Sequence, residues 1–195
     1  QALQVTATMG KNTGGHLFAR FDRGYDKLHA RFMVKFADDI DYMHHFVNLA
    51  AELPATKWPT GGAGELPAGD KKFTVAIEPH RKEDKYQPPG AWNFYCYWHR
   101  MPRSPDGKYW GAGFGGPYEQ VPRGKWQCVA IMVTCNTAGK ADGQVALWLD
   151  GSTAAHHKGN ARRRAAKIQL NRLVHMSYAP HVTAKQQKNN SGWLE

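Results

Sequence analysis

The sequence predicts an all-β fold in which two antiparallel sheets stack as a sandwich. Apolar and polar side chains alternate with a period of two along most of the chain, which is typical of half-buried strands. These alternating segments are short, and clusters rich in Gly and Pro separate them. The 20 Gly and 11 Pro residues among many short strands favour a sandwich or a barrel over a helical fold.

Residues 27–36 show the alternation most clearly, because Leu28, Ala30, Phe32 and Val34 all fall on one side. Further strands are expected at residues 73–79, 91–101, 126–135, 144–151 and 166–179. Turn-forming clusters lie between the strands, at residues 59–70, 86–90, 102–107, 111–117 and 137–143. Strands and turns thus follow one another along most of the sequence.

The length of 195 residues predicts a single domain over residues 1–195 with a sizeable core. Residues 47–55 have some helical character, but the segment is short and contains Pro54. Near the C-terminus, Trp193 and Leu194 resemble the start of one more strand. Either the sequence ends inside that element, or these residues pack as a short edge.

The chain is strongly basic, with 26 Lys and Arg against 16 Asp and Glu and a net charge of +10. Such a charge favours polyanionic partners, of which acidic polysaccharide and nucleic acid are the main classes. The pair His156–His157 and the Arg run at residues 162–164 are expected to form a solvated basic rim. No apolar stretch approaches the roughly 20 residues that cross a bilayer, so no membrane partner is expected.

Cysteine and histidine spacing gives little support for metal binding. Cys96, Cys128 and Cys135 form neither a metal-binding cluster nor a disulfide framework, and at most one intramolecular disulfide is expected. The adjacent pairs His44–His45 and His156–His157 lack the i, i+2 or i, i+4 spacing of chelating ligands. No cofactor is therefore expected, although a structural calcium ion is compatible with a sandwich of this kind.

A hairpin motif carries a family resemblance. In residues 124–151 the pattern W-x-x-V-x-x-x-V leads through an Asn and an Asp-Gly turn to W-L-D-G, and it resembles the back-sheet hairpin of concanavalin A-like jelly rolls. The order of the segments at residues 14–21, 25–42, 44–51 and 73–81 resembles the polysaccharide-lyase branch of that fold, which holds glucuronan and alginate lyases. This resemblance covers roughly residues 10–195.

The resemblance implies an exported enzyme that cleaves an acidic polysaccharide by β-elimination. A non-catalytic carbohydrate-binding module of the same fold is the alternative, since it needs aromatic platforms and hydrogen bonds but no matched acid and base. A laminarinase-type glycosidase is disfavoured because the motif Glu-x-Asp-x-x-Glu is absent. Nucleic-acid binding would depend on charge alone, because no recognition motif accompanies it.

A lyase needs a base, an acid and a group that neutralises the uronate carboxylate. Alternation in residues 91–101 places Asn93, Tyr95, Tyr97 and His99 on one face. Tyr97 and His99 are the predicted acid–base pair, and Tyr95 is predicted to bind substrate. Arg81, whose guanidinium can bind a carboxylate bidentately, is the first choice for neutralising it, and Asn93 is the second.

Four more residues complete the predicted site. His44 and His45 are both candidates, and His45 is the predicted catalytic residue. In an extended segment His45 would point away from the side of the chain on which His44 lies. His80, Asn171 and His175 are predicted to bind substrate. The alternative for each histidine is a structural hydrogen bond, and Tyr95 and Tyr97 could equally be ordinary strand aromatics.

Overall fold

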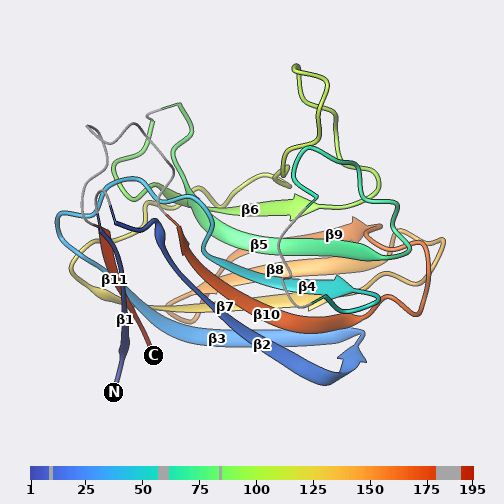
Figure 1. The fold of residues 1–195 in the computed structure, drawn as a ribbon, viewed down its shortest axis with the longest axis horizontal. Coiled ribbons are helices and arrows are strands. Elements are labelled where there is room, and N and C mark those ends of the chain that lie inside the picture. Colours follow the sequence, from blue (N-terminus) through green and yellow to red (C-terminus); the bar gives the residue numbers. More distant parts are fainter. Residues whose placement is uncertain (9–10, 57–61, 84, 179–189) are drawn as a thin grey trace.

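In the computed structural model, two antiparallel β-sheets stack as a sandwich (Figure 1). The structure describes residues 1–8, 11–56, 62–83, 85–178 and 190–195. The six-stranded sheet has the order β1 (Leu3–Ala7), β11 (Asn190–Leu194), β3 (Lys27–Phe36), β7 (Trp126–Thr134), β8 (Gly143–Leu149) and β9 (Ser152–Asn160). The five-stranded sheet has the order β2 (Gly14–Tyr25), β10 (Leu170–Tyr178), β4 (Val47–Glu52), β5 (Lys72–His80) and β6 (Ala91–Tyr97).

The predicted all-β sandwich is confirmed. The described residues contain no helix, and therefore none that is long and apolar enough to cross a membrane. Strands lie in each of the segments expected from the alternation, whereas β1, β2 and β9 lie outside those segments. The residues of β9 are mostly small and polar, so they show no alternation. Of the predicted turn cluster at residues 59–70, residues 59–61 lie outside the described part of the chain.

The core fills the space between the two sheets. The inward-facing side chains of β5, β6, β7 and β8 are almost completely buried, namely Phe73, Val75, Ile77, Trp92, Phe94, Val129, Ile131, Val133, Val145 and Leu147. Burial of one such side chain stabilises the fold by about 1.5–3 kcal/mol. Because these residues alternate, every second residue of β5 and β6 is left to face away from the core.

Two expectations about chain segments need correction. Residues 47–52 form β4 rather than a helix, because this strand hydrogen-bonds to β10 on one side and to β5 on the other. At the C-terminus the expected strand is present as β11, but it is not an edge. It lies between β1 and β3 and pairs with both. In both cases pairing across the sheet, which local sequence does not reveal, decides the structure.

Cys96, Cys128 and Cys135 are free thiols, in agreement with the prediction of at most one disulfide.

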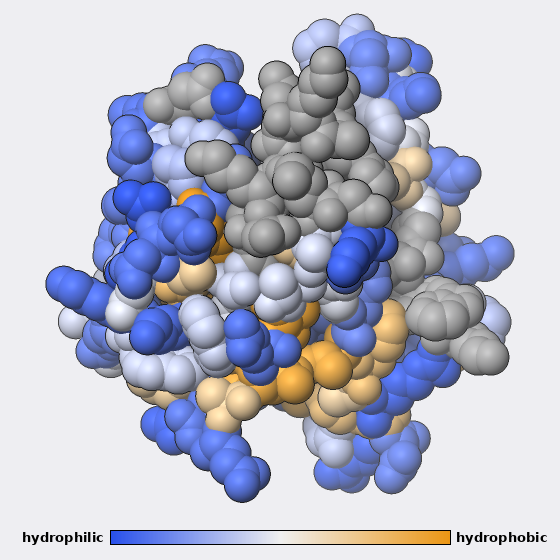
Figure 2. All heavy atoms as spheres, turned by 60° about the vertical axis from the view of Figure 1, so that its left-hand side comes forward, coloured by the Kyte–Doolittle hydropathy of each residue, from blue (hydrophilic) through white to orange (hydrophobic). Residues whose placement is uncertain are grey.

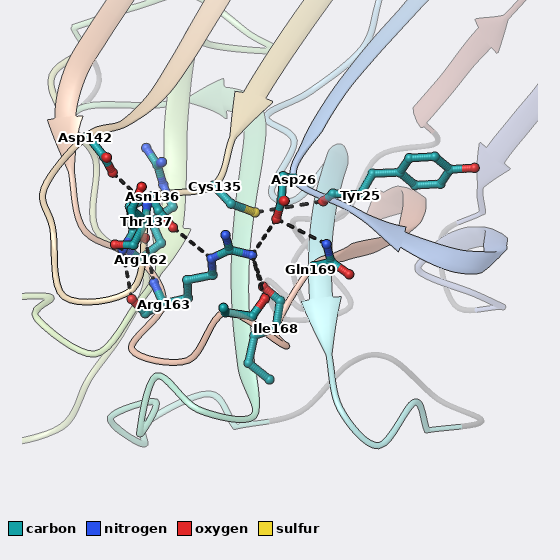
Figure 3. Close-up of polar contacts among 11 residues, drawn as sticks. Tyr25, Asp26, Cys135, Asn136, Thr137, Asp142, Arg162, Arg163, Ile168 and Gln169 are labelled. Carbon is teal, nitrogen blue, oxygen red and sulfur yellow. Dashed lines mark hydrogen bonds and ion pairs between the residues drawn. The ribbon is translucent and has the colours of Figure 1, made fainter.

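The expected solvated basic rim is wrong for Arg162 and Arg163, which are buried, whereas Arg164 and His156 are exposed. Figure 3 shows how Arg163 is held. Its Nη1 donates to Oδ1 of Asp26 at 2.7 Å and to the carbonyl of Ile168 at 2.8 Å, while its Nε donates to the carbonyl of Asn136 at 2.8 Å. A buried guanidinium is tolerated where its donors find a carboxylate and carbonyls, as they do here.

Asn136 connects the end of β7 to the chain between β9 and β10 (Figure 3). Its fully buried Oδ1 accepts the backbone N–H groups of Arg162 at 2.8 Å and Arg163 at 2.9 Å. Its Nδ2 donates to the carbonyls of Thr137, Lys140 and Arg163. One amide thus satisfies five backbone groups, and no other residue type offers this set of donors and acceptors at that size.

Replacing Asn136 by Ala should lower the free energy of unfolding by about 2–4 kcal/mol, because two buried N–H groups lose their acceptor. Urea denaturation followed by circular dichroism would measure the change. The control is Thr137→Ala at the exposed neighbouring position, which should change stability by less than about 0.5 kcal/mol. Equal stability of the Asn136→Ala variant and the wild type would contradict the assigned role.

Candidate functional site on the outer face of the five-stranded sheet

A row of polar side chains lies on the face of β5 and β6 that points away from the core. Glu78 on β5 pairs in register with Asn93 on β6. Tyr95 and Tyr97 follow Asn93 at steps of two residues, with Ala76 and Thr74 as their partners on β5. The structure therefore brings Asn93, Tyr95 and Tyr97 onto one face, as the alternation predicts.

Two histidines from the chain just before β4 meet this row. Nδ1 of His45 lies 3.0 Å from Oε2 of Glu78, and Nδ1 of His44 lies 3.7 Å from Oε1 of the same carboxylate. The two imidazole rings lie against each other with centroids 3.8 Å apart. The expectation that His44 and His45 point to opposite sides is wrong, because the backbone is not extended there: His45 has a φ of 65°.

Glu78 is the centre of this arrangement, since both histidines lie against its carboxylate. Its side chain is only 1% exposed. A carboxylate so deeply buried requires hydrogen-bonding or charged partners, and the histidines supply them. If Nδ1 of His45 carries the proton that it donates to Glu78, Nε2 keeps its lone pair and can accept a proton. Burial, followed by the charges of His45 and His80, lowers the pKa of His44 against the opposing effect of Glu78.

Tyr95 and Tyr97 form a hydrogen-bonded pair. Their hydroxyl oxygens lie 3.2 Å apart, and the backbone N–H of Gly111 donates to the Tyr95 hydroxyl at 3.0 Å. The Tyr95 ring centroid lies 5.6 Å from that of His44 and 5.4 Å from that of His45. Burial, with the hydrogen bond to Tyr97, raises the pKa of Tyr95, so its phenol stays protonated at neutral pH.

The chain after β6 returns along the edge of this strand and fixes the Tyr95 side chain. Cys96 and Ala112 exchange two backbone hydrogen bonds, each 2.9 Å long. A Cβ atom at Gly111 would lie 2.2 Å from the Tyr95 ring, so only glycine permits this close approach. A Cβ atom at Gly113 would lie 3.2 Å from Oδ1 of Asn93, which is buried and has no hydrogen-bond partner among the described residues.

Three of the predicted residues lie near or beyond the ends of these strands. The guanidinium of Arg81 lies over the Tyr42 ring, 4.6 Å from its centroid. His80 ends β5, and its charge acts on His44.

His99 lies two residues past the end of β6, where alternation no longer applies. Its Nδ1 is 3.2 Å from the carbonyl of Arg162. His99 lines a separate basic cavity with Arg100, Lys140, Arg163 and Arg164.

Two other predicted residues have structural contacts. Asn171 links β10 to β4, since its Nδ2 donates to the carbonyl of Glu52 at 2.8 Å and its Oδ1 accepts the Glu52 N–H at 3.2 Å. His175 lies on the core side of β10, in edge-on contact with Phe46 at a centroid distance of 5.0 Å. The structure thus separates Asn171 and His175 from the group around Glu78.

His175 borders an apolar hollow between the two sheets, together with Val34, Phe36 and Trp193. Figure 2 views the molecule from the side on which β1 and β11 lie in Figure 1, and apolar residues gather there among hydrophilic ones. Burial, with a smaller contribution from His16, lowers the pKa of His175 to about 4.

His175 should therefore make stability depend on pH. The unfolded chain takes up this proton near pH 6.5, whereas the folded protein resists it down to a pKa of about 4. The stabilisation is fully present above pH 6.5 and is lost as the pH falls through that window, by about 2–3 kcal/mol. In His175→Phe this component should be absent. Urea denaturation from pH 7 to pH 4.5 should then show a shallower decline in the free energy of unfolding than in the wild type. Identical declines would contradict the assignment.

Glu78 was not predicted as a site residue, and of the two candidates His44 and His45 only His45 was assigned a catalytic role. Glu78 could have been found, because it is the one acidic residue in residues 72–80, a strand that is otherwise mostly apolar, and such a charge requires partners. The role of His44 could not, since it depends on the positive φ of the residue that follows it.

The two stacked antiparallel sheets form a concanavalin A-like jelly-roll sandwich. Searches of protein-family models and of curated protein sequences find no match. Among solved structures, the chain is similar to a PL-14 alginate lyase from Aplysia kurodai, with a TM-score of 0.76 and 14% identity over 100% of this chain and 80% of that one. At such identity the likeness establishes the fold.

Two further structures agree. The alginate lyase Aly36B gives a TM-score of 0.71 at 14% identity and covers 100% of this chain and 78% of its own. An endo-β-1,4-glucuronan lyase from Trichoderma reesei gives a TM-score of 0.58 at 18% identity, over 100% of this chain and 77% of that one. The resemblance to jelly-roll polysaccharide lyases that the sequence suggested is thereby confirmed at the level of the fold.

Proposed function

We propose that this protein is a polysaccharide lyase that cleaves an acidic, uronate-containing glycan by β-elimination. The observation that carries the proposal is the convergence of an acid–base set on one sheet face: the His45–Glu78 pair and the Tyr95–Tyr97 pair. A binding module would need only aromatic and hydrogen-bonding groups, not an oriented imidazole beside a buried carboxylate.

In the proposed reaction, Nε2 of His45 removes the proton α to the uronate carboxylate. The electrons of that C–H bond form a carbon–carbon double bond to the β carbon, and the bond from the β carbon to the glycosidic oxygen breaks. A tyrosine hydroxyl of the Tyr95–Tyr97 pair gives its proton to the departing oxygen. Glu78 orients His45 and stabilises the imidazolium that forms.

Asn93 is the proposed partner of the uronate carboxylate. Negative charge builds on this group as the α proton leaves, and a nearby amide donor lowers the barrier. Asn93 lies on the same face as Tyr95 and pairs in register with Glu78. Arg81, the first choice from the sequence, lies over Tyr42 instead.

Two broader features support an acidic glycan as the substrate. The net charge of +10 attracts polyanions. The alginate lyase Aly36B, similar in fold, has been solved in complex with an alginate tetrasaccharide. A substrate of this kind also favours an exported protein.

Tyr97→Phe and His45→Gln should each lower turnover of a polyuronate by about 10²–10⁴-fold, because each removes a proton-transfer group. The assay follows the absorbance of the unsaturated product with a panel of polyuronates, after treatment with a chelator. Tyr25→Phe is the matched control, since Tyr25 ends β2 at the opposite edge of the same sheet from β6 and should leave turnover unchanged.

The carbohydrate-binding module makes a different prediction for the same proteins. If the wild type binds polyuronates but forms no unsaturated product with any of them, the lyase proposal is contradicted and the module is favoured. If product forms but Tyr97→Phe and His45→Gln match the control, the assignment of the catalytic residues is contradicted.

A further inference from the structure

We propose that His44, His45 and Glu78 form a binding site for a divalent transition-metal ion of the zinc class. One nitrogen from each histidine and one carboxylate oxygen all lie within 4.8 Å of one another. The two nearest nitrogen–oxygen separations are 3.0 and 3.7 Å. Ligands about 2.0–2.2 Å from a tetrahedral metal lie roughly 3.3 Å from each other, so small side-chain shifts would complete the site.

The backbone supports this inference independently. Adjacent residues of an extended chain point to opposite sides, and a pair of neighbouring histidines is therefore a poor chelator. Here the φ of 65° at His45 turns both imidazoles toward one carboxylate. A positive φ is unfavourable for a residue other than glycine, and such conformations cluster at ligand sites, where the surroundings maintain them.

The kinds of ligand select the kind of metal. Two imidazole nitrogens and one carboxylate suit zinc and the neighbouring transition metals, whereas calcium and magnesium prefer sites made of oxygen ligands. Glu78 supplies a negative charge from a side chain only 1% exposed, where attraction to a cation is less screened by water. Three protein ligands also leave a coordination position for water or for a carboxylate of a ligand.

Metal binding would have a consequence for the lyase reaction, and this consequence rests on the proposed function. A metal on Nδ1 of His45 leaves the ring proton on Nε2, which then cannot accept a proton from substrate. Bound metal should therefore inhibit the lyase. Metal binding itself does not depend on that function, because it is measured without any polysaccharide.

The test is a calorimetric titration of the chelator-treated full chain with ZnSO₄, with a parallel titration with CoCl₂ followed by visible absorption. We expect one zinc ion per chain with a micromolar or lower Kd. His45→Ala and the isosteric Glu78→Gln should each weaken binding at least 10-fold. CaCl₂ should give no such binding.

His156→Ala is the matched control, because it removes one member of the other adjacent histidine pair, on the exposed surface of β9. This variant should bind zinc as the wild type does. The proposal is overturned if the wild type binds zinc no more tightly than a His44→Ala/His45→Ala double variant. Circular dichroism checks each fold, and Glu78→Gln keeps the shape of the site if the alanine variants unfold. A chain without lyase activity that binds zinc would contradict only the proposed function.

Discussion

The candidate site depends on one buried charge. Glu78 interrupts an otherwise mostly apolar strand in the five-stranded sheet, where an unpartnered carboxylate would strongly destabilise the fold. The positive φ of His45 brings both imidazoles, which lie against each other, to this carboxylate. Both the proposed proton transfer and the proposed metal site use this carboxylate, in one case to orient an imidazole and in the other to bind an ion.

Much of the fold could be predicted from the sequence because strand alternation is a local property. The same rule correctly grouped Asn93, Tyr95 and Tyr97, since all three lie within β6. It failed for His99, because the strand ends at Tyr97 and the period of two ends with it. It also failed for the pair His44–His45, because a single left-handed residue changes the direction of both side chains.

Other features depend on partners that are distant in the sequence. Arg163 is buried because Asp26 lies beside it in space, although the two are 137 residues apart in the chain. Arg162 is also buried and places its guanidinium over the Phe114 ring, and burial lowers its pKa. A net charge counted from the sequence therefore overstates the positive charge available at the surface. The proposal of a glycan-cleaving site therefore rests on the aromatic and imidazole groups beside Glu78 rather than on the charge alone.

The protonation pattern of His45 tests the central role of Glu78 most directly. Long-range ¹H–¹⁵N NMR of the metal-free protein near neutral pH distinguishes the two neutral tautomers of each imidazole. The account predicts that His45 carries its proton on Nδ1, toward Glu78, and that Glu78→Gln changes the tautomer population. A wild-type His45 with its proton on Nε2, unaffected by Glu78→Gln, would contradict the account.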